Sequence, residues 1–235
     1  MKIAGRIKNG TLGEAVEDYL KAIHQLSLRS DRVTPSAVAE RLEISSAAVT
    51  KMVKRLLELE LIEYSRSQGL RLSREGERNA ARVLRTHRLM ELFLARELDL
   101  PWEEVHREAE RLEHVISARV EERIDAALGH PTHDPHGHPI PRRDGRIEKA
   151  ELTPLAQLEP GERASVSRVA DSDPDMLRYI GELGLFPGTP VEMLEPEPFG
   201  GSLRIRILGV ELPVGRELAA NVFIIREAEL ICEDS

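Results

Sequence analysis

In residues 12–72 the spacing of the apolar residues is first helical and then strand-like, and this order constrains the fold more than any other feature of the chain. Apolar residues recur at helical spacing in residues 12–28, and two further helices are predicted over 35–42 and 45–60, separated by a very short turn. Residues 61–72 have the pattern of strand, glycine-containing turn and strand. Helix, helix, tight turn, helix and hairpin together predict a winged helix-turn-helix domain.

The predicted helix 45–60 has the composition of a DNA-reading helix. In a helix-turn-helix, short polar side chains near the start of the second helix reach base edges, and basic side chains bind phosphate. Our candidate DNA contacts are Thr34, Ser36, Ser45, Ser46, Ala48, Thr50, Lys51, Lys54, Arg55, Arg66 and Arg71. The alternatives are a three-helix bundle with an ordinary solvated face and a winged helix that binds protein.

The charge of the chain is unevenly distributed. A net charge of −8 argues against a nucleic-acid partner, but residues 1–72 hold 12 Lys and Arg against 9 Asp and Glu, whereas the remainder holds 21 against 32. The single cysteine, Cys232, excludes an intramolecular disulfide and a cysteine-based zinc cluster. Since no apolar run has the length of a signal peptide or a membrane span, we expect a cytoplasmic protein with no membrane partner.

Beyond residue 72 the pattern predicts two long helices, from Ser73 to about Leu98 and from Pro101 to about Leu128. Residues 129–145 are dense in Pro, His and Gly, which predicts a hinge or linker. Short alternating runs separated by Gly and Pro then predict a small β-barrel. The expected fold class is mainly α with a β tail. Its predicted parts are a winged-helix DNA-binding domain (1–72), a helical metal-binding and dimerisation domain (73–128), a linker (129–151) and the barrel (152–235).

Four side chains that can bind metal fall within an arc of roughly 100° on the helix predicted after Pro101, namely His106, Glu110, Glu113 and His114. His87 and Glu91 lie one turn apart on the preceding helix, and Asp18 lies on the first helix. Oxygen and imidazole donors suit Mn²⁺ and Fe²⁺. A solvated helix of alternating Glu and Arg explains the spacing equally well. We treat the histidines of the linker as unfocused, because no secondary element aligns His130, His133, His136 and His138.

The chain resembles, over nearly its whole length, the iron- and manganese-dependent repressor family named for the diphtheria toxin repressor. The motifs that carry the resemblance are Glu17-Asp18-Tyr19-Leu20, Val38-Ala39-Glu40-Arg41-Leu42, His87-Arg88-Leu89 with Glu91, Val105-His106, Glu113-His114-Val115 and Pro135-His136-Gly137-His138-Pro139-Ile140-Pro141. The tail is similar to the SH3-like FeoA-type barrel through Leu183-Gly184-Leu185, Pro187-Gly188-Thr189 and Phe199-Gly200-Gly201.

The resemblance implies two metal sites. The primary site would use Asp18, Glu110, Glu113 and His114. The ancillary site would use His87, Glu91 and His106, completed by a carboxylate from the loop Asp171–Asp175, for which Asp173 and Asp175 are the candidates. It also implies a homodimer that binds a palindromic operator and represses metal-uptake genes, with no catalytic residues and no small-molecule substrate.

The resemblance also bears on the choice of metal. Asp18 replaces a methionine and Glu110 a cysteine of the iron-responsive pattern, and both match the manganese-responsive branch. Lys21, however, stands where that branch has a glutamate, and the short manganese regulators lack a barrel. We therefore expect Mn²⁺ as the effector, with Fe²⁺ as the alternative.

The hypothesis is that metal joins Asp18 to the later helices, orders the N-terminal segment and so selects a DNA-competent geometry. One rival is a di-metal carboxylate enzyme, for which Glu103-x-x-His106 is the only clear Glu-x-x-His motif. Another is a metal-transport accessory protein, suggested by the barrel alone. Neither rival explains residues 45–71.

Overall fold

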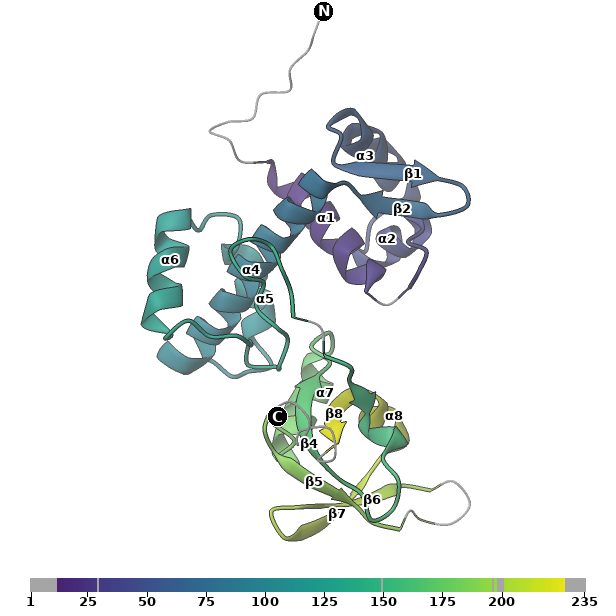
Figure 1. Cartoon of the computed structure of the whole chain (residues 1–235), viewed down its shortest axis with the longest axis vertical. Helices are drawn as coiled ribbons and strands as arrows, with labels where there is room; N and C mark the ends of the chain where they lie inside the picture. The colour runs from purple at the N-terminus through teal and green to yellow at the C-terminus, as the bar shows by residue number, and fades with distance from the viewer. Residues whose placement is uncertain (1–11, 29, 149, 196, 198–200, 227–235) are drawn as a thin grey trace, which may run out of the picture. The chain divides into compact units, whose positions relative to one another are not determined.

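The computed structural model describes residues 12–28, 30–148, 150–195, 197 and 201–226 (Figure 1). The chain divides into two compact units, an N-terminal unit of residues 1–86 and 141–147 and a C-terminal unit of residues 87–140 and 148–235. Three features of the sequence lie outside the described residues, namely the segment Met1–Gly10, Cys232 and the Phe199-Gly200 pair of the FeoA-like motif.

The N-terminal unit has the predicted winged helix-turn-helix order. Its elements are α1 (Glu14–Ser27), α2 (Pro35–Arg41), α3 (Ser46–Glu58), β1 (Ile62–Ser65) and β2 (Gly69–Leu72). Side-chain caps start both short helices: Thr34 Oγ1 accepts the Ala37 N–H at 3.1 Å, and Ser45 Oγ accepts the Ala48 N–H at 3.3 Å. The strands β1 and β2 pair antiparallel and form the wing.

The core of this unit is aliphatic. Helical spacing places Leu20 and Ile23 of α1 and Val49 and Leu56 of α3 in the interior, where all four are fully buried. Leu70 of β2 closes the same cluster. Burying each such side chain contributes about 1.5–3 kcal/mol, so packing rather than helix propensity holds these short helices.

The helix predicted from Pro101 to Leu128 is wrong as one element. After α4 (Arg74–Glu97), which crosses the boundary between the units, the structure has two helices, α5 (Val105–Leu112) and α6 (Ala118–Ala127). Ser117 ends the continuity, because its hydroxyl accepts the Val120 N–H and caps a new helix. The break leaves His114 just beyond the end of α5.

Part of the predicted linker is packed. Asp134, His136 and Ile140 are buried, and Ile140 joins the helical core of the C-terminal unit. The Val169 N–H donates to the His136 carbonyl at 2.9 Å, so the segment is bonded to the end of β4 (Arg163–Val169). Gly137 has φ +86°, and a Cβ there would lie 2.0 Å from the Ser167 carbonyl oxygen. The composition predicted a hinge, but close backbone contact fixes the segment instead.

The C-terminal residues form a six-stranded antiparallel sheet in the order β3-β8-β4-β5-β6-β7. Besides β4, its elements are β3 (Thr153–Pro154), η1 (Leu155–Gln157), α7 (Pro174–Glu182), β5 (Pro190–Met193), β6 (Leu203–Ile207), β7 (Val210–Val214), α8 (Arg216–Ala220) and β8 (Val222–Arg226). The alternating runs of the sequence, Ala164–Val169, Pro190–Leu194, Leu203–Leu208 and Val222–Ile225, coincide with β4, β5, β6 and β8. The runs did not predict β3, β7 or the helices of this part.

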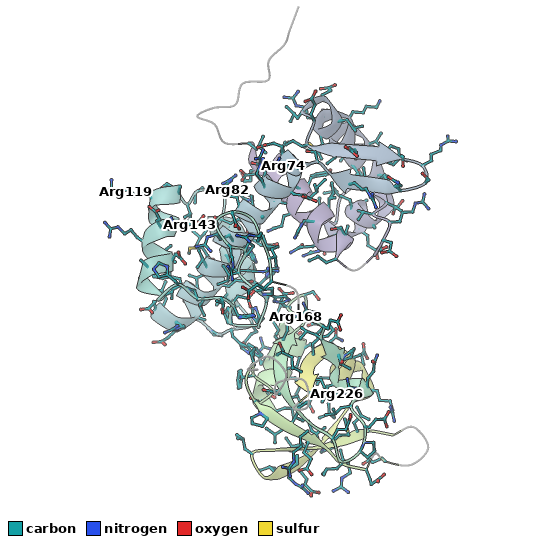
Figure 2. All side chains as sticks on the ribbon, in the orientation of Figure 1. Arg74, Arg82, Arg119, Arg143, Arg168 and Arg226 are labelled. Carbon is teal, nitrogen blue, oxygen red and sulfur yellow. The ribbon has the colours of Figure 1, made fainter. Side chains whose placement is uncertain are left out.

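The strands of this sheet alternate buried apolar side chains with polar ones. Leu203, Ile205 and Ile207 of β6 are buried, whereas the intervening arginines pair with acidic residues on neighbouring strands. On β4 the alternation shifts at a bulge between Val166 and Arg168. The Arg168 guanidinium, labelled in Figure 2, lies over the Phe223 ring at 4.6 Å from the ring centroid. In the described part of the chain, no helix is long and apolar enough to cross a membrane.

We predict that Gly76→Ala destabilises the N-terminal unit. Alanine is about 1 kcal/mol better than glycine inside a helix, but a Cβ at Gly76 would lie 2.0 Å from the Leu61 carbonyl oxygen. Relieving this contact requires a backbone shift, and we expect a net loss of more than about 1 kcal/mol in urea unfolding. The exposed neighbour Glu77→Ala serves as control and should stay within about 0.5 kcal/mol of wild type. A more stable Gly76→Ala variant would contradict the prediction.

Candidate metal centre and DNA-reading surface

The C-terminal unit contains a buried carboxylate between two imidazoles. Glu91 on α4 is 0% exposed, and its Oε1 lies 3.0 Å from His87 Nε2 and 2.8 Å from His106 Nδ1. The two imidazole nitrogens are 3.1 Å apart. His87 and Glu91 share a face of α4 because they are one turn apart, and His106 comes from α5. We call His87, Glu91 and His106 the first cluster.

Neighbouring groups orient the first cluster. His87 Nδ1 lies 2.5 Å from Glu113 Oε2, so a second buried carboxylate fixes the ring. A carboxylate on one imidazole nitrogen commonly directs the other nitrogen toward a metal ion. Burial acts to raise the pKa of the Glu91 carboxyl, yet the charge of His87 and hydrogen bonds with His106 and His87 hold this pKa well below its usual range. Glu91 is therefore an anion, the form that binds metal.

A second cluster lies in the segment that the sequence predicted as linker. Asp134, His136 and His138 each place one possible ligand atom within 4.8 Å of the others. Asp134 Oδ1 accepts the backbone N–H groups of His136 and His138, both at 2.9 Å, which holds the segment in a turn. His136 Nε2 donates to the Trp102 carbonyl at 2.8 Å, so its Nδ1 carries the lone pair.

Within the described part of the chain, Glu91 Oε2 and His136 Nδ1 are buried without a hydrogen bond, and Asp134 Oδ2 and His138 Nδ1 are buried with only an ion pair between them, at 3.4 Å. Buried polar atoms are nearly always satisfied, so each exception needs an explanation. Carboxylate and imidazole atoms left in this way are suitable ligands for a divalent cation. The residues present therefore fit the metal that the resemblance implied.

Asp171 is the aspartate of its loop that lies near the clusters. Its Oδ2 is 3.9 Å from His106 Nδ1 and 3.8 Å from His138 Nδ1. Burial acts to raise the pKa of Asp171, but the charges of His138, His106 and His136 together lower it. For His138, burial acts to lower the pKa, but Asp134 and Asp171 raise it. The clusters thus combine anionic carboxylates with a histidine that readily holds a proton.

The two aspartates selected from the sequence have other partners. Asp173 caps α7, where its Oδ1 accepts the N–H groups of Asp175 and Met176. Asp175 pairs with Arg178 at 2.9 Å, and its side chain is 90% exposed. The geometry therefore favours Asp171 over both as the carboxylate contributed by this loop.

The residues expected in the primary site are divided between the two units. Glu110, Glu113 and His114 belong to the C-terminal unit, and Asp18 lies on α1 of the N-terminal unit. Glu113 is buried and its Oε1 lies 3.3 Å from His114 Nε2. Glu110 lies 3.6 Å from His106 Nε2, and its side chain is 45% exposed. These three ligand candidates lie near the first cluster in space as well as in sequence.

Sequence reasoning missed Asp134, His136 and His138 as a group. A signal was present, because residues two apart face the same side of an extended segment. The surrounding prolines form no regular secondary structure, so the sequence offered no reason to expect these three side chains to converge. The structure shows that hydrogen bonds to Asp134 and the Trp102 carbonyl do the aligning.

The candidate DNA contacts form the exposed side of the helix-turn-helix. On α3, Val49 and Val53 face the core, while Ser46, Ala48, Thr50, Lys51 and Lys54 are exposed. Arg55 is half-buried and pairs with Glu58 at 3.4 Å. The remaining candidates are the two helix caps Thr34 and Ser45, the exposed Ser36 beside them, and Arg66 and Arg71, which are exposed on the wing.

Comparison with known families gives separate matches for the DNA-reading surface, the metal-binding helices and the C-terminal sheet. Residues 11–70 match the iron dependent repressor N-terminal DNA binding domain, and residues 73–142 match the iron dependent repressor metal binding and dimerisation domain. Residues 153–226 match the FeoA domain. The chain belongs to the iron-dependent repressor family. The resemblance drawn from the sequence motifs and the expected fold class are both confirmed.

Relatives in the iron-dependent repressor family include both iron and manganese regulators. The iron-dependent repressor IdeR of Mycobacterium leprae is 34% identical, over 83% of this chain and 89% of the relative. The diphtheria toxin repressor of Corynebacterium jeikeium is 30% identical, over 79% and 87%. A solved manganese-dependent transcriptional repressor in complex with manganese is 34% identical, with a TM-score of 0.83 over 90% of this chain and 99% of that one.

We predict that Asp171→Asn weakens Mn²⁺ binding, whereas Asp175→Asn does not. Asp171 lies within 4 Å of two cluster histidines, whereas Asp175 pairs with Arg178. Removing even an outer-shell partner typically costs 10- to 100-fold in metal affinity, so we expect at least a tenfold loss for Asp171→Asn in calorimetric titration. Equal affinities for the two variants would exclude Asp171 as a ligand.

Proposed function

We propose that this chain is a metal-dependent transcriptional regulator, a repressor of metal-uptake genes that binds a palindromic operator as a homodimer. The observation that carries the proposal is the buried cluster around Glu91 in a chain that also exposes a polar and basic α3. Family membership supports both parts, because the matched descriptions name DNA binding, metal binding and dimerisation. A two-fold dimer would place two reading helices on the two halves of one operator.

For the effector we propose Mn²⁺, with Fe²⁺ as the alternative. The proposed ligands are carboxylates and imidazoles, which suit these two metals, and none is a thiolate or thioether. Asp18 and Glu110, which follow the manganese-responsive pattern, favour Mn²⁺. The similarity to a manganese-dependent repressor supports this choice, and the similarity to IdeR keeps Fe²⁺ as the alternative. Anaerobic titration of promoter binding with each metal decides between them.

In the proposed switch, one cation would be held by the ligands that the resemblance implies, Asp18, Glu110, Glu113 and His114. Another would be held by the first cluster with Asp171. A bound cation supplies the positive charge that allows carboxylates from different elements to converge. Asp18 would thereby be tied to the helices behind the reading domain, which selects one arrangement of α1. DNA and metal should each tighten binding of the other, by linkage.

The structure gives the enzyme alternative little support. Glu103, which completes the Glu-x-x-His motif with His106, accepts a hydrogen bond from Arg178 Nε at 3.2 Å. A di-metal bundle enzyme would need this carboxylate as a ligand. Neither an enzyme nor a transport accessory protein accounts for the exposed face of α3.

We predict that Asp18→Ala and Glu110→Ala abolish the effect of Mn²⁺ on DNA binding. Allosteric coupling typically changes affinity by about 5- to 150-fold, and we expect wild type to gain this much on its own promoter region when Mn²⁺ is added. Glu108→Ala is the matched control, because Glu108 lies on α5 but pairs with Arg111 at 2.9 Å. A gel shift with and without Mn²⁺ measures the effect. If either ligand variant keeps the full gain, the switch is refuted.

We predict that Lys51→Ala lowers the salt dependence of promoter binding. Lys51 is exposed on α3, and each phosphate contact contributes about 0.9 to the slope of log affinity against log salt. Fluorescence anisotropy at several salt concentrations, with saturating Mn²⁺, should give a slope shallower by about this amount. Lys51→Arg keeps the charge and should keep the slope. An unchanged slope for Lys51→Ala would remove Lys51 from the DNA surface.

A further inference from the structure

The wing is a short hairpin that needs support from outside itself. Its strands β1 and β2 pair over four residues each (Figure 1), and a lone two-stranded hairpin is at best marginally stable in water. Ser65 Oγ accepts the Gln68 N–H at 3.1 Å, but this bond lies within the turn and does not attach the turn to the domain. The wing carries the candidate DNA contacts Arg66 and Arg71, so whatever holds the wing also determines where these arginines lie.

The loop between α1 and α2 reaches the tip of the wing through Arg32. Arg32 Nη2 donates to the Arg66 carbonyl at 2.8 Å, although the two residues are 34 positions apart. Arg66 lies in the turn of the hairpin. Hydrogen bonds from an ionised donor are stronger than those between neutral groups. Ser30 Oγ bonds both backbone ends of Arg32, accepting its N–H at 3.3 Å and donating to its carbonyl at 3.2 Å, which holds the loop in place.

The same loop also holds the base of the wing. The Leu70 N–H donates to the Val33 carbonyl at 2.8 Å, and Val33 is bridged to both Gly69 and Leu70. Gly69 has φ +76°, and a Cβ there would lie 2.3 Å from the Val33 carbonyl oxygen and 3.1 Å from Arg32 Cγ. The stem of Arg32 therefore passes close to the wing base before its guanidinium reaches the tip.

The residue after Val33 belongs to the helix-turn-helix. Thr34 caps α2 by accepting the Ala37 N–H. Three consecutive residues thus contact the wing tip, the wing base and the start of α2, in that order along the chain: Arg32, Val33 and Thr34. Since α2 and α3 share one buried core, this arrangement holds the wing and the reading helix at a set separation.

We infer that Arg32 is a positioning residue for DNA recognition, which holds the wing tip by the Arg66 carbonyl and so directs the Arg66 side chain toward phosphate. Ordering the wing before DNA arrives reduces the cost of ordering it on binding. The role in recognition deepens the proposed function, since it rests on DNA as the ligand. The contact between the loop and the wing exists without DNA, and can be tested without it.

A direct phosphate contact is the alternative role for Arg32, because its side chain is exposed. The two roles differ in how Arg32 and Arg66 combine. If Arg32 acts through Arg66, removing Arg66 leaves Arg32 nothing to position, and a second substitution adds no further loss. Two independent phosphate contacts would instead give losses that add.

The first measurement is limited trypsin digestion of the full chain without DNA. Trypsin cleaves after Arg66, at the carbonyl that Arg32 holds, and cleavage follows local opening of the chain. One hydrogen bond is typically worth about 2- to 10-fold in such an equilibrium, so we expect Arg32→Ala to be cut after Arg66 faster by about this factor, measured by mass spectrometry of the fragment. Cleavage of Arg32→Ala at the wild-type rate overturns the inference.

Arg41→Ala is the matched control. Arg41 is an exposed arginine of the same unit, and its Nη2 donates to Gln25 Oε1 at 3.1 Å. The substitution removes the same charge without touching the wing, so the cleavage rate after Arg66 should equal that of wild type. If Arg32→Ala is unfolded by circular dichroism, Arg32→Gln replaces it.

The second measurement is promoter binding with saturating Mn²⁺ by fluorescence anisotropy at several salt concentrations. We expect Arg66→Ala to make the slope of log affinity against log salt shallower by about 0.9, the loss of one phosphate contact. Arg32→Ala should weaken binding by no more than Arg66→Ala does. The double variant should match Arg66→Ala in both affinity and slope. A double variant that loses a second increment of slope overturns the inference and makes Arg32 a DNA contact in its own right.

The two measurements separate this inference from the proposed function. A wild type that binds its promoter with Mn²⁺, while Arg32→Ala is cleaved at the wild-type rate, refutes the role of Arg32 and leaves the proposed function standing. A wild type that binds its promoter with neither metal refutes the proposed function, and faster cleavage of Arg32→Ala would still support the contact that holds the wing.

Discussion

The buried carboxylate of Glu91 is the constraint on which the C-terminal unit depends. Moving an unpaired carboxylate out of water costs several kcal/mol, so a residue with no exposed surface must be compensated by its neighbours. The compensating groups come from α4 and α5, while the 129–151 segment and the loop after β4 bring further ligand atoms close to them. These contacts compensate the buried charge in the packed unit. The packing of the unit and the chemistry of its centre therefore have one cause.

Outer groups determine which atoms of the centre are available. The carboxylate of Glu113 fixes the His87 ring, and the carbonyl of Trp102 accepts a hydrogen bond from His136 Nε2. Each contact uses one imidazole nitrogen and leaves the other directed at the cluster. Trp102 is itself held by close packing, because a Cβ on Gly181 of α7 would lie 2.9 Å from its indole nitrogen. Rigid packing of this kind sets ligand positions before any ion binds.

The N-terminal unit is stabilised by helix caps and an aliphatic core. Its helices are short and capped, its core is aliphatic, and its polar residues are free to face outward. Among the helices and strands of the described residues, only α4 belongs to both units, with Gly76 against Leu61 on one side of the boundary and Glu91 on the other.

The sequence determined the winged-helix order and the placement of His87 and Glu91 one turn apart, because each depends on residues within a few positions of one another. It did not separate Asp171 from Asp173 and Asp175, three carboxylates of equal chemistry in one loop. Only the tertiary structure did so, since α7 takes Asp173 as its cap and Arg178 takes Asp175. The second cluster was hidden for a related reason: Asp134 holds the turn locally, but the Trp102 carbonyl that orients His136 is 34 residues away in sequence. Local patterns predict local structure, whereas a buried site is decided by what the fold brings next to it.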